Sequence, residues 1–137
     1  MKTLLLAVLV TIASGCASTQ KEPPPKPLVG TKWQVVLELP MAGEQPTFRF
    51  GDGRVEGFGG CNRVTARYVQ DTVGARAIVI GRIEAGMRSS CDPLLQEAER
   101  RMLDVLQSAS SYTITADLMS MTGSAGTLKF RAIDPNP

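Results

Sequence analysis

Hydrophobic and polar residues alternate along much of the chain. Strict alternation places every second side chain on the same face, so such segments are predicted to be β-strands with one buried and one solvated face. The clearest examples are Trp33, Val35, Leu37 and Leu39, then Phe48 and Phe50, then Tyr112, Ile114 and Ala116, and then Leu128, Phe130 and Ala132. Residues 76–83, RAIVIGRI, are apolar on both faces at their centre, and we expect a more buried strand there.

Turn residues separate the predicted strands. Asp52 and Gly53 lie between two of them, and an Asp-Gly pair tolerates the positive φ that a tight hairpin needs. Residues 122–126 are predicted to form a second tight connection, and Gly74 marks a third. The predicted strands are therefore short and follow one another through turns.

One segment has helical periodicity. Asp92 is a predicted N-cap, and Pro93 fits the first helical position. Residues 94–110 then place apolar side chains at helical spacing, namely Leu95, Ala98, Met102, Val105, Leu106 and Ala109. The charged side chains are expected mainly on the other side, namely Glu97, Glu99, Arg100, Arg101 and Asp104. This segment is predicted to be one amphipathic helix.

A single helix among seven or eight short strands indicates an α+β fold. We expect a small antiparallel β-barrel or half-barrel, with the amphipathic helix packed against it or plugging one end of its core. The folded part should span residues 28–133, and a domain of this size can bury one core without help from metals.

The first fifteen residues resemble an export signal. Lys2 makes the start positive, and residues 4–12 form an apolar run of nine residues, too short for a spanning helix of about 20 residues. Small residues then precede Cys16, as in the lipobox of bacterial lipoproteins. By this resemblance the signal peptide, residues 1–15, is removed and Cys16 is lipidated. The alternative is an ordinary signal peptide cut nearby, which leaves Cys16 as a free thiol.

A tether is predicted between the lipid and the domain, so that residues 16–27 comprise the lipidated Cys16 and this tether. Residues 17–27 carry four prolines and no apolar side chain beyond Ala17, so they cannot join a core. At about 3.1 Å per residue, ten such residues reach up to roughly 30 Å from the bilayer. We expect a protein that is lipid-anchored in the bacterial envelope. Because Ala17 and not aspartate follows the cysteine, we expect the outer membrane, facing the periplasm.

The composition argues against several classes of function. The formal net charge of +2 falls to +1 once Lys2 leaves with the signal, whereas nucleic-acid binding relies on many contacts from basic residues to phosphates. The chain has no histidine, the usual base for a Cys or Ser nucleophile and a common zinc ligand. Asp52, Asp71 and Asp92 are better explained as turn or cap residues. We expect no enzymatic activity, cofactor, metal or nucleic-acid partner.

Two cysteines, Cys61 and Cys91, are left once Cys16 is assigned to the lipid. In an oxidising, exported compartment such a pair is by default a disulfide. The alternatives are two buried free thiols or a reactive thiol. A bridge across thirty residues would stabilise the fold by about 3.5 kcal/mol in the chain-entropy model. It would tie a glycine-rich hairpin to the start of the helix.

Three glycines, Gly57, Gly59 and Gly60, precede Cys61. Without Cβ atoms they allow backbone to pass close to backbone at a bulge or barrel corner. A phosphate cradle is disfavoured, because no Lys-Ser or Lys-Thr pair follows them and no helix opens there. Asn62 is predicted to turn the chain by bonding its own backbone.

These residues also resemble the META domain, which occurs in the heat-inducible lipoprotein HslJ and its relatives. The similarity covers about residues 28–133 and includes residues 28–33, residues 57–63, Tyr68, Arg88, Cys91, Glu97 and Tyr112. We take as the family motif Gly30, Trp33, Gly59, Gly60, Cys61, Asn62, Arg88 and Cys91. The chain departs from the family's usual Thr-Arg/Lys-Met-Ala-Cys at residues 87–91, and Ala66 stands where a glycine is common.

The resemblance implies a small barrel-like α+β domain without established catalytic residues. It also implies a link to envelope stress and, in some members, to drug tolerance, virulence or motility. The family's shape is similar to that of secretion pilotins, which are lipoproteins with an apolar groove for lipid or peptide.

The leading hypothesis is a non-enzymatic envelope lipoprotein that binds an apolar ligand or a partner segment. Its support is a set of methionines, which adapt to irregular ligands but serve equally as core filler: Met87, Met102, Met119 and Met121. The second hypothesis is an inhibitor of an envelope protease or lysozyme. Its candidate partner loop consists of Gly86, Met87, Arg88, Ser89 and Ser90. A pilotin-like assembly chaperone is a further alternative.

Overall fold

The computed structural model describes residues 21–71, 76–86 and 90–133. The predicted signal peptide, Cys16, Gly74, Met87, Arg88 and Ser89 lie outside these residues. The strands are β1 (Lys32–Val35), β2 (Thr47–Gly51), β3 (Arg54–Phe58), β4 (Arg63–Gln70), β5 (Ile78–Ile80), β6 (Glu84–Ala85), β7 (Ala109–Thr115), β8 (Leu118–Gly123) and β9 (Gly126–Ala132). The helix α1 spans Pro93–Ser108.

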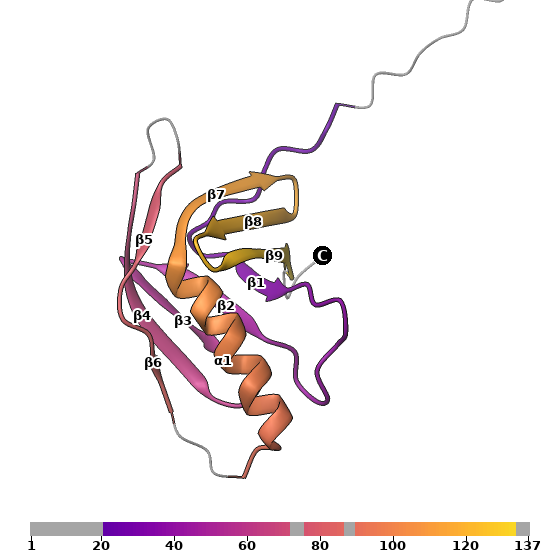
Figure 1. Ribbon diagram of the computed structural model, residues 1–137. Coiled ribbons are helices and arrows are strands. Elements are labelled where there is room, and N and C mark those ends of the chain that lie inside the picture. Colours follow the sequence, from indigo (N-terminus) through magenta and orange to yellow (C-terminus); the bar gives the residue numbers. More distant parts are fainter. Residues whose placement is uncertain (1–20, 72–75, 87–89, 134–137) are drawn as a thin grey trace, which may run out of the picture.

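The strands form one antiparallel sheet that curls into a nearly closed barrel (Figure 1). The strand order is β5-β4-β3-β2-β1-β9-β8-β7, and β6 pairs with β4 off this path. The two ends of the sheet approach where Ala77 and Ser111 form an isolated antiparallel bridge. There the backbone N–H of Tyr112 donates to the carbonyl of Arg76 at 3.1 Å. The predicted small barrel with one helix is confirmed.

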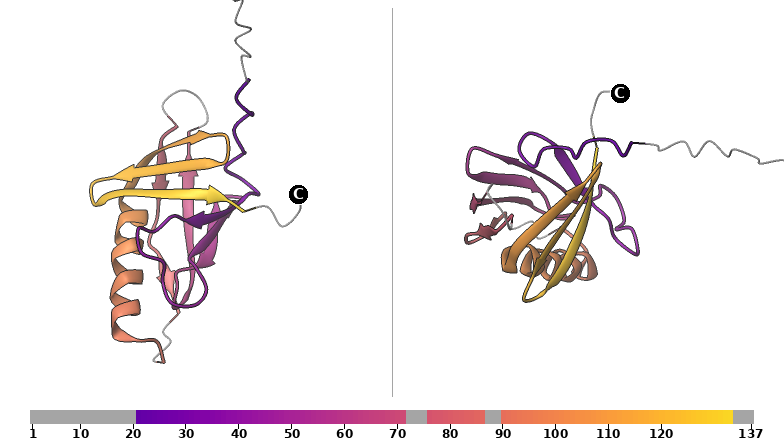
Figure 2. Two further views of the ribbon diagram at one scale, coloured as in Figure 1. Left: turned by 90° about the vertical axis from the view of Figure 1, so that its right-hand side faces the viewer. Right: turned by 90° about the horizontal axis from the view of Figure 1, so that it is seen from above.

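The helix α1 packs against β5, β8 and β9 and lies in the mouth of the curved sheet (Figure 2). It begins as predicted, because Asp92 is the N-cap, its carboxylate accepts from the N–H of Leu94 at 2.7 Å, and Pro93 is the first helical residue. Met102 and Leu106 are buried on its inner side. Glu99 is buried with them, so the expectation that it lies on the charged side is wrong.

Aromatic side chains fill the interior of the barrel. Trp33 and Phe50 are fully buried, and Phe48 and Phe130 meet edge to face with ring centroids 6.4 Å apart. The indole N–H of Trp33 donates to the carbonyl of Leu28 at 3.1 Å, which ties the start of the domain to the core. Three of the four methionines proposed to adapt to a ligand lie in the described ranges, and all three are core residues, as the alternative interpretation held: Met102, Met119 and Met121.

The predicted turns at residues 52–53 and 122–126 are confirmed, whereas the one at Gly74 lies outside the described residues. Two of the strand predictions need correction. Asp52 and Gly53 have φ values of 43° and 71° in the hairpin between β2 and β3. The alternation that predicted a longer first strand ends at Val35, and Leu39 is 85% exposed. In the segment expected to be a more buried strand, Ile78 and Ile80 point into the core, but Val79 between them is 66% exposed, because the sheet's outer face is solvated there.

Candidate functional site

The loop that joins β3 to β4, residues 59–62, is attached to the start of α1 by a disulfide. Cys61 and Cys91 are bonded, with Cα atoms 6.0 Å apart, and Cys61 is 2% exposed. The predicted disulfide is therefore confirmed. It lies one residue before the N-cap Asp92, so it joins the sheet to the beginning of the only helix in the described part of the chain.

A buried carboxylate holds the same loop from further along α1. One carboxylate oxygen of Glu99 accepts the backbone N–H groups of Cys61 and Asn62, at 2.8 and 2.7 Å. The other accepts from the side-chain amide of Asn62 at 2.6 Å. Glu99 is 4% exposed. The expectation that Asn62 bonds its own backbone therefore needs correction, because its side-chain amide donates to Glu99 on the helix.

Glu99 is a site residue that sequence reasoning missed, although a signal was present. It follows Leu95 by four residues and precedes Met102 by three, so it lies on the apolar stripe of the helix. A charged residue on such a stripe requires polar partners inside the protein. Here the partners are the donors of the glycine-rich loop.

Close packing explains the glycines of the loop. A Cβ atom at Gly59 would lie 2.6 Å from a carboxylate oxygen of Glu99. At Gly57 it would overlap the carbonyl oxygen of Thr47 on the neighbouring strand, and Gly60 has a φ of 109°. The predicted packing role of these residues is therefore confirmed, since larger residues would push the loop away from the helix or β3 away from β2.

Glu97, which the family resemblance singled out, is a surface residue. Its carboxylate bonds to Arg100 and Arg101 at 2.9 and 2.7 Å, and these hydrogen bonds lower its pKa from 4.5 to about 2. The glutamate that contacts the glycine-rich loop is Glu99, two residues later.

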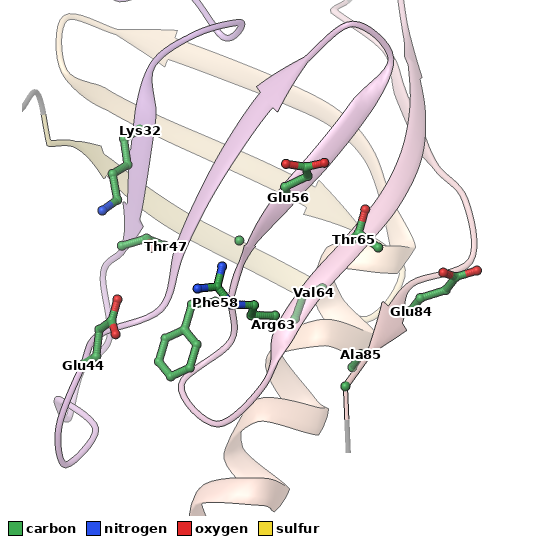
Figure 3. Close-up of a pocket in the computed structure, with 12 residues that line it drawn as sticks. Lys32, Glu44, Thr47, Glu56, Phe58, Arg63, Val64, Thr65, Glu84 and Ala85 are labelled. Carbon is green, nitrogen blue, oxygen red and sulfur yellow. The ribbon is translucent and has the colours of Figure 1, made fainter. Parts of the chain in front are cut away.

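A groove of about 840 Å³ lies on the outer face of the sheet (Figure 3). We call it the outer-face groove. Its lining comes from β1, β2, β3, β4, β6 and adjacent loops: Lys32, Glu44, Thr47, Glu56, Gly57, Phe58, Arg63, Val64, Thr65, Glu84, Ala85 and Gly86. Within the figure, the ring of Phe58 lies between Glu44 and Arg63.

The groove combines charges of both signs with an aromatic surface. Phe58 is half-buried and is the register partner of the exposed Arg63 on β4. These two residues directly precede and follow the loop 59–62. Glu44, Glu56 and Glu84 add carboxylates at the walls, and Lys32 adds a second positive charge. The arrangement suits a ligand with both charged and apolar groups.

The sequence profile of the META domain matches residues 26–134 of this chain. The chain belongs to the META domain family. No curated protein matches it in sequence.

Solved structures with low sequence identity share the fold of this META domain. A protein from Burkholderia xenovorans, solved by NMR, is 19% identical with a TM-score of 0.63, and the match covers 89% of this chain and 99% of that one. A second NMR structure is 14% identical with a TM-score of 0.60, covering 78% and 92%. A DUF4847 family protein from Bacteroides vulgatus ATCC 8482 is 13% identical with a TM-score of 0.54, covering 76% and 93%.

The remaining motif residues have structural positions in the META domain. Gly30 has a φ of 87°, and its N–H donates to the carbonyl of Phe50 at 2.8 Å. Together with Trp33, it fixes the chain entry against the barrel. Arg88 lies outside the described residues, so its role stays a prediction.

Only the two ends of the predicted partner loop can be placed. Gly86 and Ser90 are exposed, and the N–H of Gly86 donates to the carbonyl of Arg63 at 3.0 Å. Met87, Arg88 and Ser89 between them are outside the described ranges, so the inhibitor hypothesis stays a prediction. No helix in the described ranges is long and apolar enough to cross a membrane. Nor do the described side chains of Asp, Glu and Cys form a group of three that could hold a metal.

Proposed function

We propose that this protein is a non-enzymatic, lipid-anchored protein of the bacterial envelope whose META domain binds an extended segment of a partner protein in the outer-face groove. The observation that carries the proposal is the groove itself, with Phe58 between side chains of opposite charge. The proposal places the protein in the envelope stress response or in drug tolerance, in line with the family resemblance.

The position of the groove supports an extended peptide as ligand. Its wall includes β6, which pairs with β4 and with no other strand in the described part of the chain. Such a strand edge offers backbone donors and acceptors to an added strand, while side-chain pockets read every second residue of the ligand. Phe58 would take an apolar side chain, and Lys32 and Arg63 would take acidic ones.

Because side chains fill the barrel interior, we place the ligand site on the outer face of the sheet and not inside the barrel. Met119 and Met121 are each 1% exposed among the core aromatics, so they support packing and not an internal apolar ligand. Phe58, by contrast, is an aromatic side chain outside the core cluster.

The sequence supports the anchor. The short apolar run of residues 4–12, the small residues before Cys16 and the prolines of the tether together predict a lipoprotein. Residues 21–27 have no regular secondary structure and are exposed, in keeping with a tether. Several acyl chains hold a protein on a membrane much more firmly than one.

Photo-cross-linking in intact cells tests the groove. A photoreactive phenylalanine replaces Phe58 in the full chain, and the matched control carries it at Leu118, a 45% exposed residue on β8. We expect an adduct with one defined envelope protein from position 58 only. Mass spectrometry should place the cross-link in an extended segment of that partner.

A charge reversal then ties the adduct to the groove. Arg63→Glu should reduce the adduct from position 58 without lowering the thermal midpoint, because Arg63 is exposed. Equal cross-linking from positions 58 and 118, or an adduct that Arg63→Glu leaves unchanged, would refute binding in the groove.

A further inference from the structure

A second exposed surface lies beside the outer-face groove, on β3, β4, β5 and the segment after β5. Val69 and Val79 are register partners on this surface and are 72% and 66% exposed. Beside them is a hollow of about 420 Å³ whose lining includes Arg54, Arg67 and Arg82. We call these five residues the arginine–valine face.

The arginines of this face form no salt bridge with another described residue. Arg54 and Arg67 are directly opposite each other across β3 and β4, an arrangement of like charges that is unfavourable on a sheet. Within the described ranges, the salt bridges formed by arginines involve Arg100, Arg101 and Arg131 and none of these three. The hollow has one carboxylate in its lining, Glu84. An anion bound here would offset the repulsion.

We propose that the arginine–valine face docks on a membrane surface that bears anionic phospholipid headgroups. Arginine binds phosphate through charge-assisted, bidentate hydrogen bonds. Exposed apolar side chains such as Val69 and Val79 can enter the boundary between headgroups and acyl chains. A free phosphate would use the arginines and leave the valines in water, so the pairing of charges with apolar side chains favours a membrane.

The position of the tether is consistent with docking of this face on a membrane. Figures 1 and 2 show the described part of the tether leaving the barrel at the end where β4 ends and β5 begins. The backbone N–H of Lys26 donates to the carbonyl of Ala116 at 2.8 Å, which fixes where the tether leaves the domain. The inference rests on the anchor in the proposed function, since a lipid at Cys16 would keep the face within about 30 Å of the bilayer.

A fluorescent label at one position of the full chain tests the docking. With Cys16 lipidated and Cys61 bonded to Cys91, the thiol of Val79→Cys is the one available for an environment-sensitive dye. Leu118→Cys on β8 is the matched control. Each labelled protein is mixed with vesicles of phosphatidylcholine alone or with phosphatidylglycerol added, and attachment is measured separately by flotation.

We expect the dye at position 79 to shift to the blue, and to be quenched by shallow spin-labelled lipid, in the anionic vesicles only. The dye at position 118 should not respond. Replacing Arg54, Arg67 and Arg82 by glutamine should lower the ratio of docked to undocked domain about 5-fold per arginine. The thermal midpoint should not fall, because the substitutions also remove the repulsion between Arg54 and Arg67.

Failure of the anchor and failure of the docking give different results. A chain that does not float refutes the lipid anchor, whereas the dye still reports whether the face contacts added anionic vesicles. An unshifted dye at position 79 in floating protein overturns the docking. The docking is also overturned if neutral vesicles give an equal shift, or if inorganic phosphate binds to the arginines while the dye stays unshifted.

Discussion

Replacing Glu99 by alanine should destabilise the domain strongly, because two backbone donors lose their acceptor at once. The N–H groups of Cys61 and Asn62 both donate to one carboxylate oxygen, and Cys61 is 2% exposed. Leaving a buried donor unpaired costs roughly 1–3 kcal/mol. Asn62 is half-buried and can reach water more easily, so we expect a total loss of about 2–5 kcal/mol. That is a large part of a typical stability of about 5–15 kcal/mol.

A glutamine at position 99 should be tolerated much better than alanine. Its amide oxygen can accept both backbone N–H groups, and its amide nitrogen can donate to Asn62 once the Asn62 amide turns over. All three hydrogen bonds then persist, and only the contribution of the charge is lost. We expect Glu99→Gln to lower the free energy of unfolding by about 1–2 kcal/mol.

Urea unfolding followed by tryptophan fluorescence measures these differences. Trp33 is the single tryptophan and is fully buried, so its emission reports the loss of the core. The disulfide stays oxidised throughout, and Glu97→Ala, which changes an exposed glutamate on the same helix, is the control. Equal losses for alanine and glutamine at position 99, or a loss below about 1 kcal/mol for alanine, would refute the acceptor role.

Three further predictions concern Gly59, Glu97 and Cys16. Gly59→Ala should lower the free energy of unfolding by about 2–3 kcal/mol, because the new Cβ would lie 2.6 Å from the hydrogen-bonded carboxylate of Glu99. Gly51→Ala is the control in thermal unfolding and should be nearly neutral, because a Cβ there has no atom within 4 Å. Hydrogen bonds lower the pKa of Glu97 from 4.5 to about 2, so the small contribution of the ionised side chain to stability should be constant above pH 4.5 and vanish as the pH falls through about 2. Acid unfolding of the protein and of Glu97→Gln, compared side by side, checks this. Cys16→Ala should release the protein from the membrane fraction or trap its precursor, and a variant that stays attached and mature would contradict lipidation.

The features that the sequence predicts well are set by local chemistry. A hairpin at Asp52 and Gly53 follows from the positive φ that these residue types tolerate. The helix start follows from the carboxylate of Asp92 and the fixed φ of Pro93. Each depends on a few neighbouring residues, so no knowledge of the tertiary structure is needed.

The features that the sequence does not predict depend on which face of a strand or helix packs against the rest of the protein. Val79 lies in an apolar run, yet the single helix among the described elements packs on the inner side, and the outer face at Val79 stays in solvent. Glu99 is charged, but the donors that allow its burial come from a loop 37 residues earlier in the chain. Such pairing is decided by how the sheet curls and is not visible in the periodicity.

The disulfide and the outer-face groove share one stretch of backbone, and this links stability to binding. Phe58 and Arg63 flank the loop that holds Cys61, and the loop is fixed to α1 by the disulfide and by Glu99. Changing Cys61 and Cys91 together to alanine should lower the free energy of unfolding by about 2–4 kcal/mol and leave the barrel folded below its new midpoint.

In that folded range, of the disulfide and the Glu99 hydrogen bonds only the latter would still hold the loop to the helix, so Phe58 and Arg63 should lose part of their fixed spacing. We expect photo-cross-linking from position 58 to fall in the double variant at a temperature where circular dichroism shows an intact fold. Position 118 on β8, which pairs with β7 and β9, should give no adduct either with or without the disulfide. Unchanged cross-linking despite the lower stability would show that the sheet alone shapes the groove and that the disulfide serves only folding.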